Sequence, residues 1–344
     1  MTMDLTFLGT GSAYPSPHRG ASALVLRTEG DCWLFDCGEG TQTQLMKSQL
    51  KASRITKVFI THLHGDHLFG LPGLLCTVSL NLSPAQPPAC VDIYGPRGLR
   101  HFLRVALSLS GSQLLFPYAV HELEPTADQC PPEPAGRRAG LLRRREPAPA
   151  GAPGRTIPLD AARDRYALLE DERFVVEAFR LFHRLPSFGF AVQERDRPGR
   201  LNTQLLRDLG VKPGPVYGRL KGGEAVTLES GRVLTPEEVL EEAVPGRKAT
   251  LADGHRERAV EHGHSTPAMA AAVARACQAR KLVLYHFSQR YRPLSLRAEG
   301  DGDGDDDDVV ELRRQAEEAL RDAGTEVVLA DDFLTIPIPI KRLR

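Results

Sequence analysis

The sequence lacks a net charge, long apolar runs and closely spaced cysteine pairs. Its 44 Lys and Arg residues balance 44 Asp and Glu residues over 344 positions. Net charge therefore supplies no general attraction to nucleic acid, and any RNA contact must come from a local basic patch. No apolar run approaches the roughly 20 residues that a membrane-spanning helix needs. These absences exclude an integral membrane protein with helical spans.

The six cysteines are scattered, and none of them forms a C-x-x-C pair. This spacing argues against a zinc ribbon or a disulfide framework and favours reduced, mostly buried thiols. The N-terminal sequence MTMDLTFLGTG has no basic segment followed by an apolar segment, so we expect no secretory signal. A cytosolic or nuclear location follows as the expectation. The cysteines are Cys32, Cys37, Cys76, Cys90, Cys130 and Cys277.

The apolar pattern predicts a mixed α/β domain that spans residues 1–344. Strand-like runs and amphipathic segments alternate, which favours two packed sheets flanked by helices. The helix at 267–280 is expected to begin with Ser265 as its N-cap. Strands are predicted at 5–8, 23–27, 33–36, 58–61, 91–94, 174–182, 188–192, 282–285, 326–329 and 333–338, and helices at 41–50, 97–109, 236–243, 267–280 and 309–323.

Two segments resemble inserts. Residues 131–155 are rich in Pro, Ala, Gly and Arg and carry too little apolar surface to offset the cost of chain ordering, which predicts a disordered loop. Residues 300–308 read GDGDGDDDD, which superficially resembles a calcium-binding loop. Because Leu312 stands where such a loop needs Glu, we interpret the segment as an acidic solvated insert.

The densest cluster of potential metal ligands follows the strand predicted at 58–61. Its sequence is His62-Leu63-His64-Gly65-Asp66-His67, which offers four potential ligands within six residues. Imidazoles and carboxylates are good zinc ligands, and α/β proteins gather ligand sites at the carboxyl ends of strands. The alternative is an incidental surface cluster of histidines, which rarely has this density. The cluster therefore predicts a metal site.

Six stretches, taken in this order, are similar to short-form ribonuclease Z, also called zinc phosphodiesterase of the ElaC type. The resemblance covers nearly the whole chain apart from the two inserts. It implies the metallo-β-lactamase αββα sandwich with a protruding exosite arm. The stretches are FLGTGSAYPSPHRGASALVL, LFDCGEGTQTQL, FITHLHGDHLFGLPGLL, FRLFHRLPSFGF, EHGHSTP and YHFSQRY.

The resemblance implies a zinc-dependent endonuclease that removes the 3′ trailer from precursor tRNA and leaves a 3′ hydroxyl. It also implies a homodimer. Two zinc ions are expected: one on His62, His64 and His183, the other on Asp66, His67 and His286. Asp66 would also act as a proton acceptor. His264 would help to protonate or stabilise the reacting phosphate.

A basic segment at 195–235 is punctuated by Gly and Pro and resembles the exosite arm of the family, which clamps tRNA far from the metals. Contacts of this kind hold phosphates without reading sequence. From composition alone, a solvated basic hairpin is equally acceptable. The residues expected to contact RNA are Arg197, Arg200, Lys212, Arg219 and Lys221.

The chain departs from the family after the arm. Gly246-Arg247-Lys248 runs directly into Ala249-Thr250-Leu251, and the Gly-Asp-(Thr/Ser/Cys) and His-Glu-Ala-Thr motifs are both missing. No apolar run between Pro245 and Ser265 is long enough for a buried strand, so the sandwich is expected to lack two strands. Asp253 does not match the bridging position. Each zinc ion would then keep at most three protein ligands.

Two alternatives follow from these observations. The first is another phosphodiesterase with the metallo-β-lactamase fold, because fold alone does not fix function. The second is a catalytically impaired variant that binds tRNA or dimerises, because the bridging segment is absent. Manganese or another divalent ion would also suit nitrogen and oxygen ligands of this kind.

Overall fold

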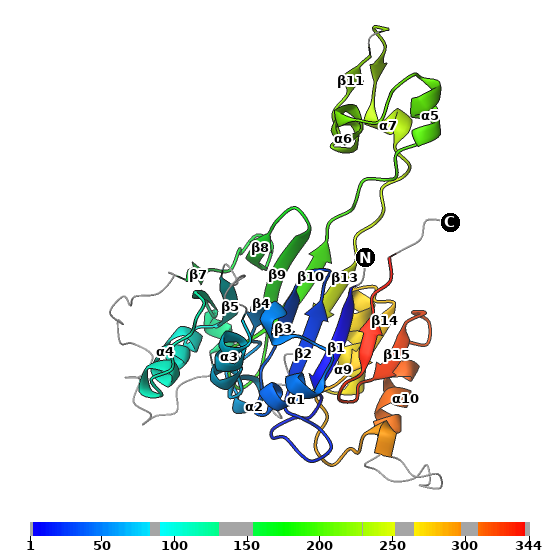
Figure 1. Cartoon of the computed structure of the whole chain (residues 1–344). Coiled ribbons are helices and arrows are strands. Elements are labelled where there is room, and N and C mark those ends of the chain that lie inside the picture. Colours follow the sequence, from blue (N-terminus) through cyan, green and yellow to red (C-terminus); the bar gives the residue numbers. More distant parts are fainter. Residues whose placement is uncertain are drawn as a thin grey trace. The chain divides into compact units, whose positions relative to one another are not determined.

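The computed structural model describes residues 3–82, 90–130, 154–228, 230–251, 265–296 and 309–340 (Figure 1). Its contacts divide the chain into two compact units. Unit 1 comprises Met1–Leu168, Glu177–Ala191 and Thr250–Ile338, and unit 2 comprises Leu169–Val176, Val192–Ala249 and Pro339–Arg344. The arm predicted at 195–235 falls within unit 2. The assignment of the whole chain to one domain stays a prediction.

Unit 1 contains a sheet of eight strands in the order β16-β1-β2-β3-β4-β5-β6-β7. β1 pairs antiparallel with β16 and β2, whereas β3 to β7 run parallel to one another. Parallel strands bring their carboxyl ends to one edge, where α/β proteins place their ligand sites. The strands are β1 (Asp4–Gly9), β2 (Ala23–Arg27), β3 (Cys32–Phe35), β4 (Ile55–Phe59), β5 (Val91–Pro96), β6 (Tyr118–Leu123), β7 (Thr156–Ile157) and β16 (Thr335–Pro337).

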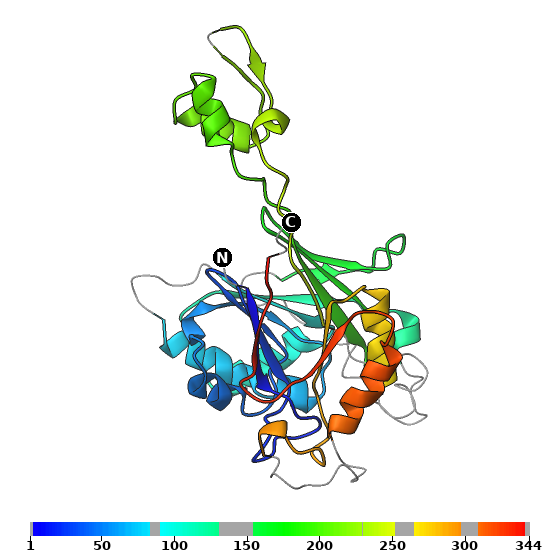
Figure 2. The same cartoon turned by 90° about the vertical axis from the view of Figure 1, so that its right-hand side faces the viewer.

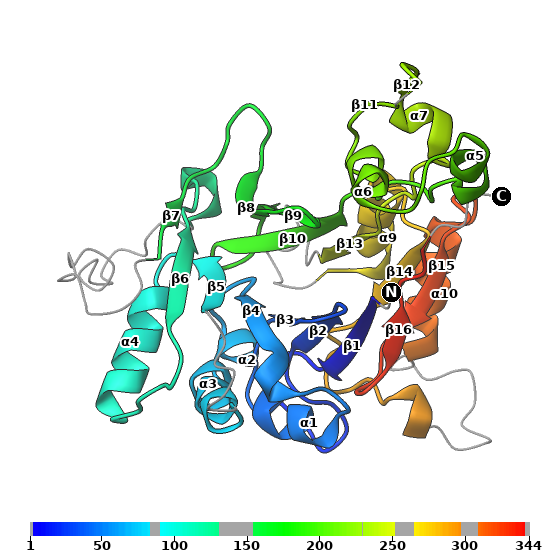
Figure 3. The same cartoon turned by 45° about the horizontal axis from the view of Figure 1, so that its top comes forward.

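Helices cover one side of this sheet (Figure 3). Leu45 of α1, Leu74 of α3 and Leu103 of α4 join Val58 and Ile93 of the sheet in one buried apolar cluster. Full burial of such side chains contributes about 1.5–3 kcal/mol each. The helices therefore stabilise the sheet whose strand ends carry the ligand-rich loop. The helices are α1 (Thr41–Lys47), α2 (Gly65–Leu68), α3 (Leu71–Leu80) and α4 (Leu99–Leu109), with short 3-10 turns η1 (Ala52–Arg54) and η2 (Ala127–Gln129).

A second sheet has the order β13-β10-β9-β8. Within unit 1, Phe190 of β10 contacts Phe35 and Phe59 of the larger sheet at ring-centroid distances of 5.9 and 5.4 Å. These aromatic contacts bury the facing sides of the two sheets, as in a sandwich. The strands are β8 (Tyr166–Glu170), β9 (Phe174–Leu181), β10 (Ser187–Glu194) and β13 (Lys248–Leu251).

The C-terminal part of unit 1 forms a separate layer with its own apolar cluster. The parallel strands β14 (Lys281–Leu284) and β15 (Glu326–Leu329) pack with helices α9 (Pro267–Ala276) and α10 (Val309–Ala319), which lie side by side in Figure 2. η3 (Leu294–Leu296) follows β14. The layers confirm the predicted mixed α/β architecture. No helix of the described residues is long and apolar enough to cross a membrane.

The arm segment of unit 2 folds around a small apolar core of its own. Leu206, Leu220 and Leu234 are fully buried there. The Asn202 side chain caps α5 by accepting a 3.0 Å hydrogen bond from the Leu205 amide. The segment is thus a small folded module and not only a hairpin. Its elements are α5 (Thr203–Asp208), α6 (Pro215–Lys221), β11 (Val226–Thr227), β12 (Val233–Leu234) and α7 (Pro236–Val239).

A buried cluster of charged side chains lies next to the arm segment in unit 2 and consists of Glu194, Arg197 and Arg247. Glu194 accepts hydrogen bonds from Arg247 Nε at 2.7 Å and from Arg247 Nη2 at 2.9 Å, and it also pairs with Arg197. The side chains of Glu194 and Arg247 are 3% and 4% exposed. Burial by itself would raise the pKa of Glu194, but the bonds from the two arginines outweigh it and lower that pKa to about 2.

Two expectations about local structure need correction, the N-cap of α9 and the ends of four helices. The N-cap of α9 is Thr266, whose side chain accepts a bond from the Met269 amide, and not Ser265. A strand, β13, lies between Pro245 and Ser265, but only its Leu251 is buried, so it is not the buried strand whose absence was expected. The predicted ends of the helices at 41–50, 236–243, 267–280 and 309–323 are too late by three or four residues.

The cysteines are free, as expected, but only Cys32 and Cys37 are buried, so the prediction of mostly buried thiols is wrong. The inserts predicted at 131–155 and 300–308 lie outside the described residues, except for Gly154 and Arg155. Gly154 packs so closely on β6 that an added Cβ would lie 1.7 Å from the Val120 carbonyl oxygen.

Candidate metal centre

The ligand-rich loop leaves the sheet at the end of β4. Ile60 and Thr61 continue from the strand, and the next residues carry His62 and His64 before α2 begins at Gly65. The loop is packed against the turn after β3, where a Cβ on Gly38 would lie 2.2 Å from the Asp66 carbonyl oxygen. Only glycine permits this close approach of the two backbones. The backbone that carries Asp66 and His67 is therefore firmly positioned.

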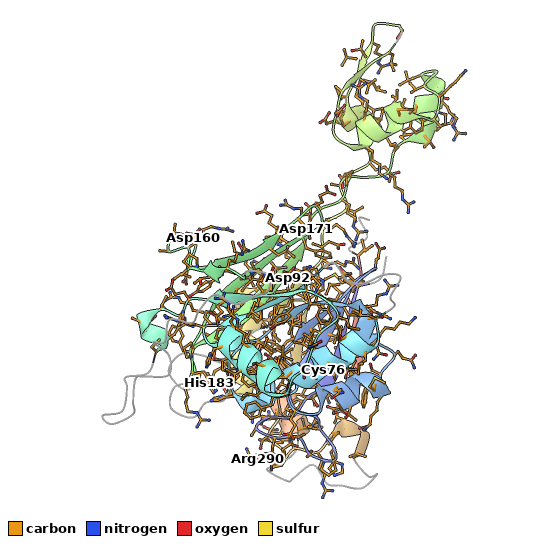
Figure 4. The ribbon with its side chains drawn as sticks, turned by 60° about the vertical axis from the view of Figure 1, so that its left-hand side comes forward. Cys76, Asp92, Asp160, Asp171, His183 and Arg290 are labelled. Carbon is orange, nitrogen blue, oxygen red and sulfur yellow. The ribbon has the colours of Figure 1, made fainter. Side chains whose placement is uncertain are left out.

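The first group of potential ligands is His62, His64 and His183. Their ligand atoms all lie within 4.8 Å of one another. His183, which follows the end of β9 (Figure 4), has its Nε2 3.1 Å from His64 Nδ1. His183 lies 119 positions after His64 in the sequence. The fold brings the three histidines together, and they are the three ligands that the family resemblance implies for one ion.

The second group is Asp66, His67 and His286, whose ligand atoms also lie within 4.8 Å of one another. Asp66 Oδ2 is 3.5 Å from His67 Nε2 and 3.9 Å from His286 Nε2. The groups adjoin, since the His62 and His67 ring centroids are 4.0 Å apart. No residue of the described chain belongs to both groups.

Asp36 supports the second group through His67, a role that the sequence did not predict. Its Oδ2 lies 2.8 Å from His67 Nδ1, and its Oδ1 accepts bonds from the Thr61 amide at 2.8 Å and from the Thr61 hydroxyl at 3.0 Å. A carboxylate on one ring nitrogen orients the other toward a metal and raises its basicity. Asp36 ends the strand predicted at 33–36 and lies in the stretch LFDCGEGTQTQL, but neither position indicated that it supports a metal ligand.

Two further contacts fix ligand side chains. Ser22 Oγ lies 2.6 Å from His286 Nδ1, and the Ala13 amide donates a 2.7 Å hydrogen bond to Asp66 Oδ2. Ala13, Asp36 and His286 all have positive φ angles, of 67°, 57° and 63°. Non-glycine residues seldom adopt this region, and such strain concentrates at functional sites.

The environment sets the protonation of the ligands. Burial, aided by the neighbouring imidazoles, lowers the pKa of His62 well below its ordinary value. Burial would raise the pKa of Asp66, but His67, His286 and the Ala13 amide together lower it. A neutral imidazole and an ionised carboxylate are the forms that bind metal.

All six residues line one cavity of about 420 Å³. Its wall also contains Tyr14, Glu39, Phe69 and Arg184. The lining thus carries two carboxyl groups, on Glu39 and Asp66, but only one guanidinium. An anionic ligand would find little attraction in the protein alone. Cations bound to the two groups would reverse this balance.

The donor set fits metal binding. Imidazole and carboxylate ligands suit zinc, and three protein ligands leave a coordination position open, as in catalytic sites. The two groups are therefore a candidate metal centre for two adjacent ions. Of the remaining predicted residues, His264 lies outside the described part of the chain. Arg197, Arg200, Lys212, Arg219 and Lys221 all belong to unit 2.

The amino-acid sequence is similar to those of known proteins over 99% of the chain. Residues 3–111 match the family model described as anti-Pycsar protein Apyc1. The chain is 56% identical over 370 aligned positions to zinc phosphodiesterase ELAC protein 1 of Bos taurus, with 99% of this chain and 100% of the relative covered. Because 370 positions exceed the 344 residues of the chain, the relative carries residues that this chain lacks.

Solved structures agree. The human short-form tRNase Z, ELAC1, is 43% identical with a TM-score of 0.61, and 98% of this chain and 100% of that chain are covered. The Bacillus subtilis metallo-β-lactamase fold protein YhfI is 12% identical with a TM-score of 0.52, covering 98% and 100% of the two chains, which supports the fold alone. The chain therefore belongs to the short-form tRNase Z family of ELAC-type zinc phosphodiesterases and has the metallo-β-lactamase fold.

Proposed function

We propose that this protein is a zinc-dependent endonuclease that removes the 3′ trailer from precursor tRNA and leaves a 3′ hydroxyl on the tRNA. The observation that carries the proposal is the pair of adjoining ligand groups in one cavity. The chain is also similar over its full length to a zinc phosphodiesterase and to the solved structure of a tRNase Z.

The ligand groups divide the metal-binding work. His62, His64 and His183 would hold one ion, and Asp66, His67 and His286 would hold the other. Bound zinc ions would supply a water of lowered pKa and would neutralise charge on the scissile phosphate. The rest of the chemistry falls to the protein, which must orient the ligands and move protons.

Proton transfer is assigned to Asp66 and His264. The lowered pKa of Asp66 keeps its carboxylate ionised near neutral pH, as a proton acceptor must be. The Ala13 amide holds Oδ2 in place with a 2.7 Å bond, so the carboxylate has a fixed orientation. We propose that His264 helps to protonate or stabilise the reacting phosphate, as the family resemblance implies.

The arm of unit 2 is proposed to bind the phosphates of tRNA. Arg200, Lys212 and Lys221 are exposed, so their charges are available to a polyanion. Arg219 already pairs with Glu224 at 2.8 Å and Arg197 with Glu194, which makes these two weaker candidates than the sequence suggested. We further propose a homodimer located in the cytosol or the nucleus.

A second candidate function follows from one observation. No side chain among the described residues is shared by both ligand groups, so no protein carboxylate there screens the repulsion between two cations. If the second ion is lost for this reason, the chain would bind precursor tRNA without cutting it.

The test is cleavage of a precursor tRNA that carries a 3′ trailer by zinc-loaded protein, with the product ends mapped. The proposal predicts a mature 3′ hydroxyl end and a 5′ phosphate on the trailer. His64→Ala should abolish cutting but retain tRNA binding. Binding of intact precursor by the wild-type chain, with no product even in excess zinc, would instead favour the impaired variant.

A further inference from the structure

An aromatic ring stands in the wall of the metal cavity. Phe69 lies two residues after His67, lines the same cavity, and is 63% exposed. Single exposed apolar side chains are common on proteins, so exposure alone means little. Its position beside six polar ligand residues is what requires an explanation.

Two contacts hold the Phe69 ring. An added Cβ on Gly65 would lie 2.4 Å from Phe69 Cε2, so the ring lies directly against the backbone of the ligand loop. Phe102 of α4 stacks with Phe69 at a centroid distance of 6.4 Å and an interplanar angle of 19°. Phe102 itself packs against the main apolar core. A ring fixed in this way loses little conformational freedom when a ligand stacks on it.

The positively charged side chain of Arg184 lines the same cavity. Arg184 follows the potential ligand His183 directly, and its side chain is exposed. A guanidinium forms paired hydrogen bonds with phosphate oxygens. His183 Nε2 lies 3.1 Å from His64 Nδ1, so Arg184 directly follows a residue of the first ligand group. The cavity therefore presents an aromatic ring and a guanidinium beside the metal centre.

We propose that Phe69 and Arg184 form a nucleotide subsite next to the metal centre, a proposal that rests on the proposed nuclease function. Phe69 stacks on the base of an unpaired nucleotide next to the scissile phosphate, and Arg184 binds a neighbouring phosphate. Single-stranded RNA is recognised in this manner, by aromatic stacking and basic contacts to the backbone. Stacking accepts any base, so the subsite would orient the strand without selecting its sequence.

The first experiment is a kinetic cycle that combines a protein change with a substrate change. Phe69→Leu is compared with wild type on a precursor tRNA with normal bases and on precursors that are abasic on one or the other side of the scissile phosphate. On the normal precursor, Phe69→Leu should lower kcat/KM by about 5- to 150-fold. On the precursor that lacks the stacked base, the same change should have little further effect.

The controls separate stacking from folding. Phe69→Tyr keeps a ring and should restore most of the activity that Phe69→Leu removes. Phe333→Leu removes an exposed ring that does not line the cavity and should match wild type. Melting temperature and bound zinc are measured for each variant. A loss with Phe69→Leu that is the same on normal and abasic precursors would overturn the stacking role.

The second experiment measures binding without turnover. A precursor tRNA carries 2-aminopurine beside the scissile linkage, in which a methylene replaces the bridging oxygen so that the RNA is not cut. Stacking on Phe69 should quench the 2-aminopurine fluorescence in wild type and Phe69→Tyr but not in Phe69→Leu. Equal quenching in all three proteins would contradict the subsite.

Arg184 has a different signature. Arg184→Gln should lower kcat/KM by about tenfold or more on normal and abasic precursors alike, because the contact is to phosphate. Dependence of its effect on the base would overturn that assignment. If wild type does not cut precursor tRNA yet quenches the probe through Phe69, the nuclease proposal fails and the subsite stands. If wild type cuts and Phe69→Leu cuts equally well, only the subsite fails.

Discussion

Asp36 Oδ2 lies 2.8 Å from His67 Nδ1, and both side chains are almost fully buried. The carboxylate therefore fixes the imidazole so that Nε2 faces Asp66 and the second ligand group. The contact joins the residue after β3 to helix α2, which follows β4, and β3 and β4 are neighbouring strands of the sheet. Asp36 lies in the stretch LFDCGEGTQTQL, but only the fold shows that it supports His67.

Replacement of Asp36 by Asn should weaken metal binding at the second group by about 10- to 100-fold, because the orienting carboxylate is lost. Competition with a chromophoric chelator measures this affinity. Asp92→Asn is the control, since Asp92 lies on the sheet outside the cavity and pairs with His121 at 3.2 Å. Unchanged zinc affinity in Asp36→Asn would show that the 2.8 Å contact does not support a metal ligand.

Arg19 is a buried residue whose guanidinium lies 4.7 Å from the centre of the Phe287 ring, directly after His286. Its side chain is 1% exposed, and its Nη1 donates to Thr10 Oγ1 at 2.8 Å and to the Ala330 carbonyl at 3.0 Å. Arg19→Met should lower the free energy of unfolding by about 3–5 kcal/mol, as expected when one partner of a buried charged network is removed. Urea denaturation measures the change. Arg314→Met, which removes a side chain that is 66% exposed, should stay within about 0.5 kcal/mol of wild type. The same small effect in Arg19→Met would contradict the structural role of Arg19.

Glu194 should make the stability depend on pH in the acid range. Its folded pKa of about 2 lies below the ordinary 4.5, so its contribution is full above pH 4.5 and is lost as pH falls through about 2. The shift corresponds to about 3 kcal/mol. The difference in unfolding free energy between wild type and Glu194→Gln should therefore shrink as pH falls from about 5 to about 2.

Glu170→Gln is the matched control for Glu194. Glu170 pairs with Arg195, but its side chain is 71% exposed, so its removal should change little at any pH. A difference between wild type and Glu194→Gln that stays constant over the same acid range would mean that the buried cluster does not hold Glu194 ionised.

Exposed lysines of the arm should govern the salt dependence of tRNA binding. In the double variant Lys212→Ala and Lys221→Ala, the slope of log affinity against log salt should fall by about 0.9 for each phosphate that the arm no longer neutralises. Turnover of a small phosphodiester should not change, because it needs only the cavity. Lys47→Ala with Lys51→Ala, two exposed lysines outside the arm, is the control. Identical slopes in both double variants would remove the arm from RNA binding.

Local sequence was enough to predict the strand before the first ligands, but not the short helix α2 that carries Asp66 and His67. The strand before His62 and the density of ligands up to His67 are readable because they are contiguous. His183 and His286 are isolated in sequence, and only their place in ordered motifs indicated their role. Asp36 also stands in one of these motifs, but its supporting role depends on the pairing of β3 with β4 and could not be predicted from the sequence.

The other differences between the predicted and the observed elements also have physical causes. Ser265 and Thr266 are both good N-caps, so the sequence alone could not decide between them. β13 has a single buried residue, Leu251, because it lies at the edge of its sheet, and a mostly exposed strand gives no apolar run to detect. The arm has the sequence character of a basic loop because its apolar residues are spread over short elements that pack only after folding.

Zinc bound per folded chain, measured by mass spectrometry of metals after removal of loosely bound ions, bears most directly on the paired ligand groups. The geometry predicts two ions in wild type, one for each group, and a single ion in either His183→Ala or His286→Ala, because each variant breaks one group. A single ion or fewer in the wild-type chain, with no further loss in one of these variants, would contradict a two-ion centre.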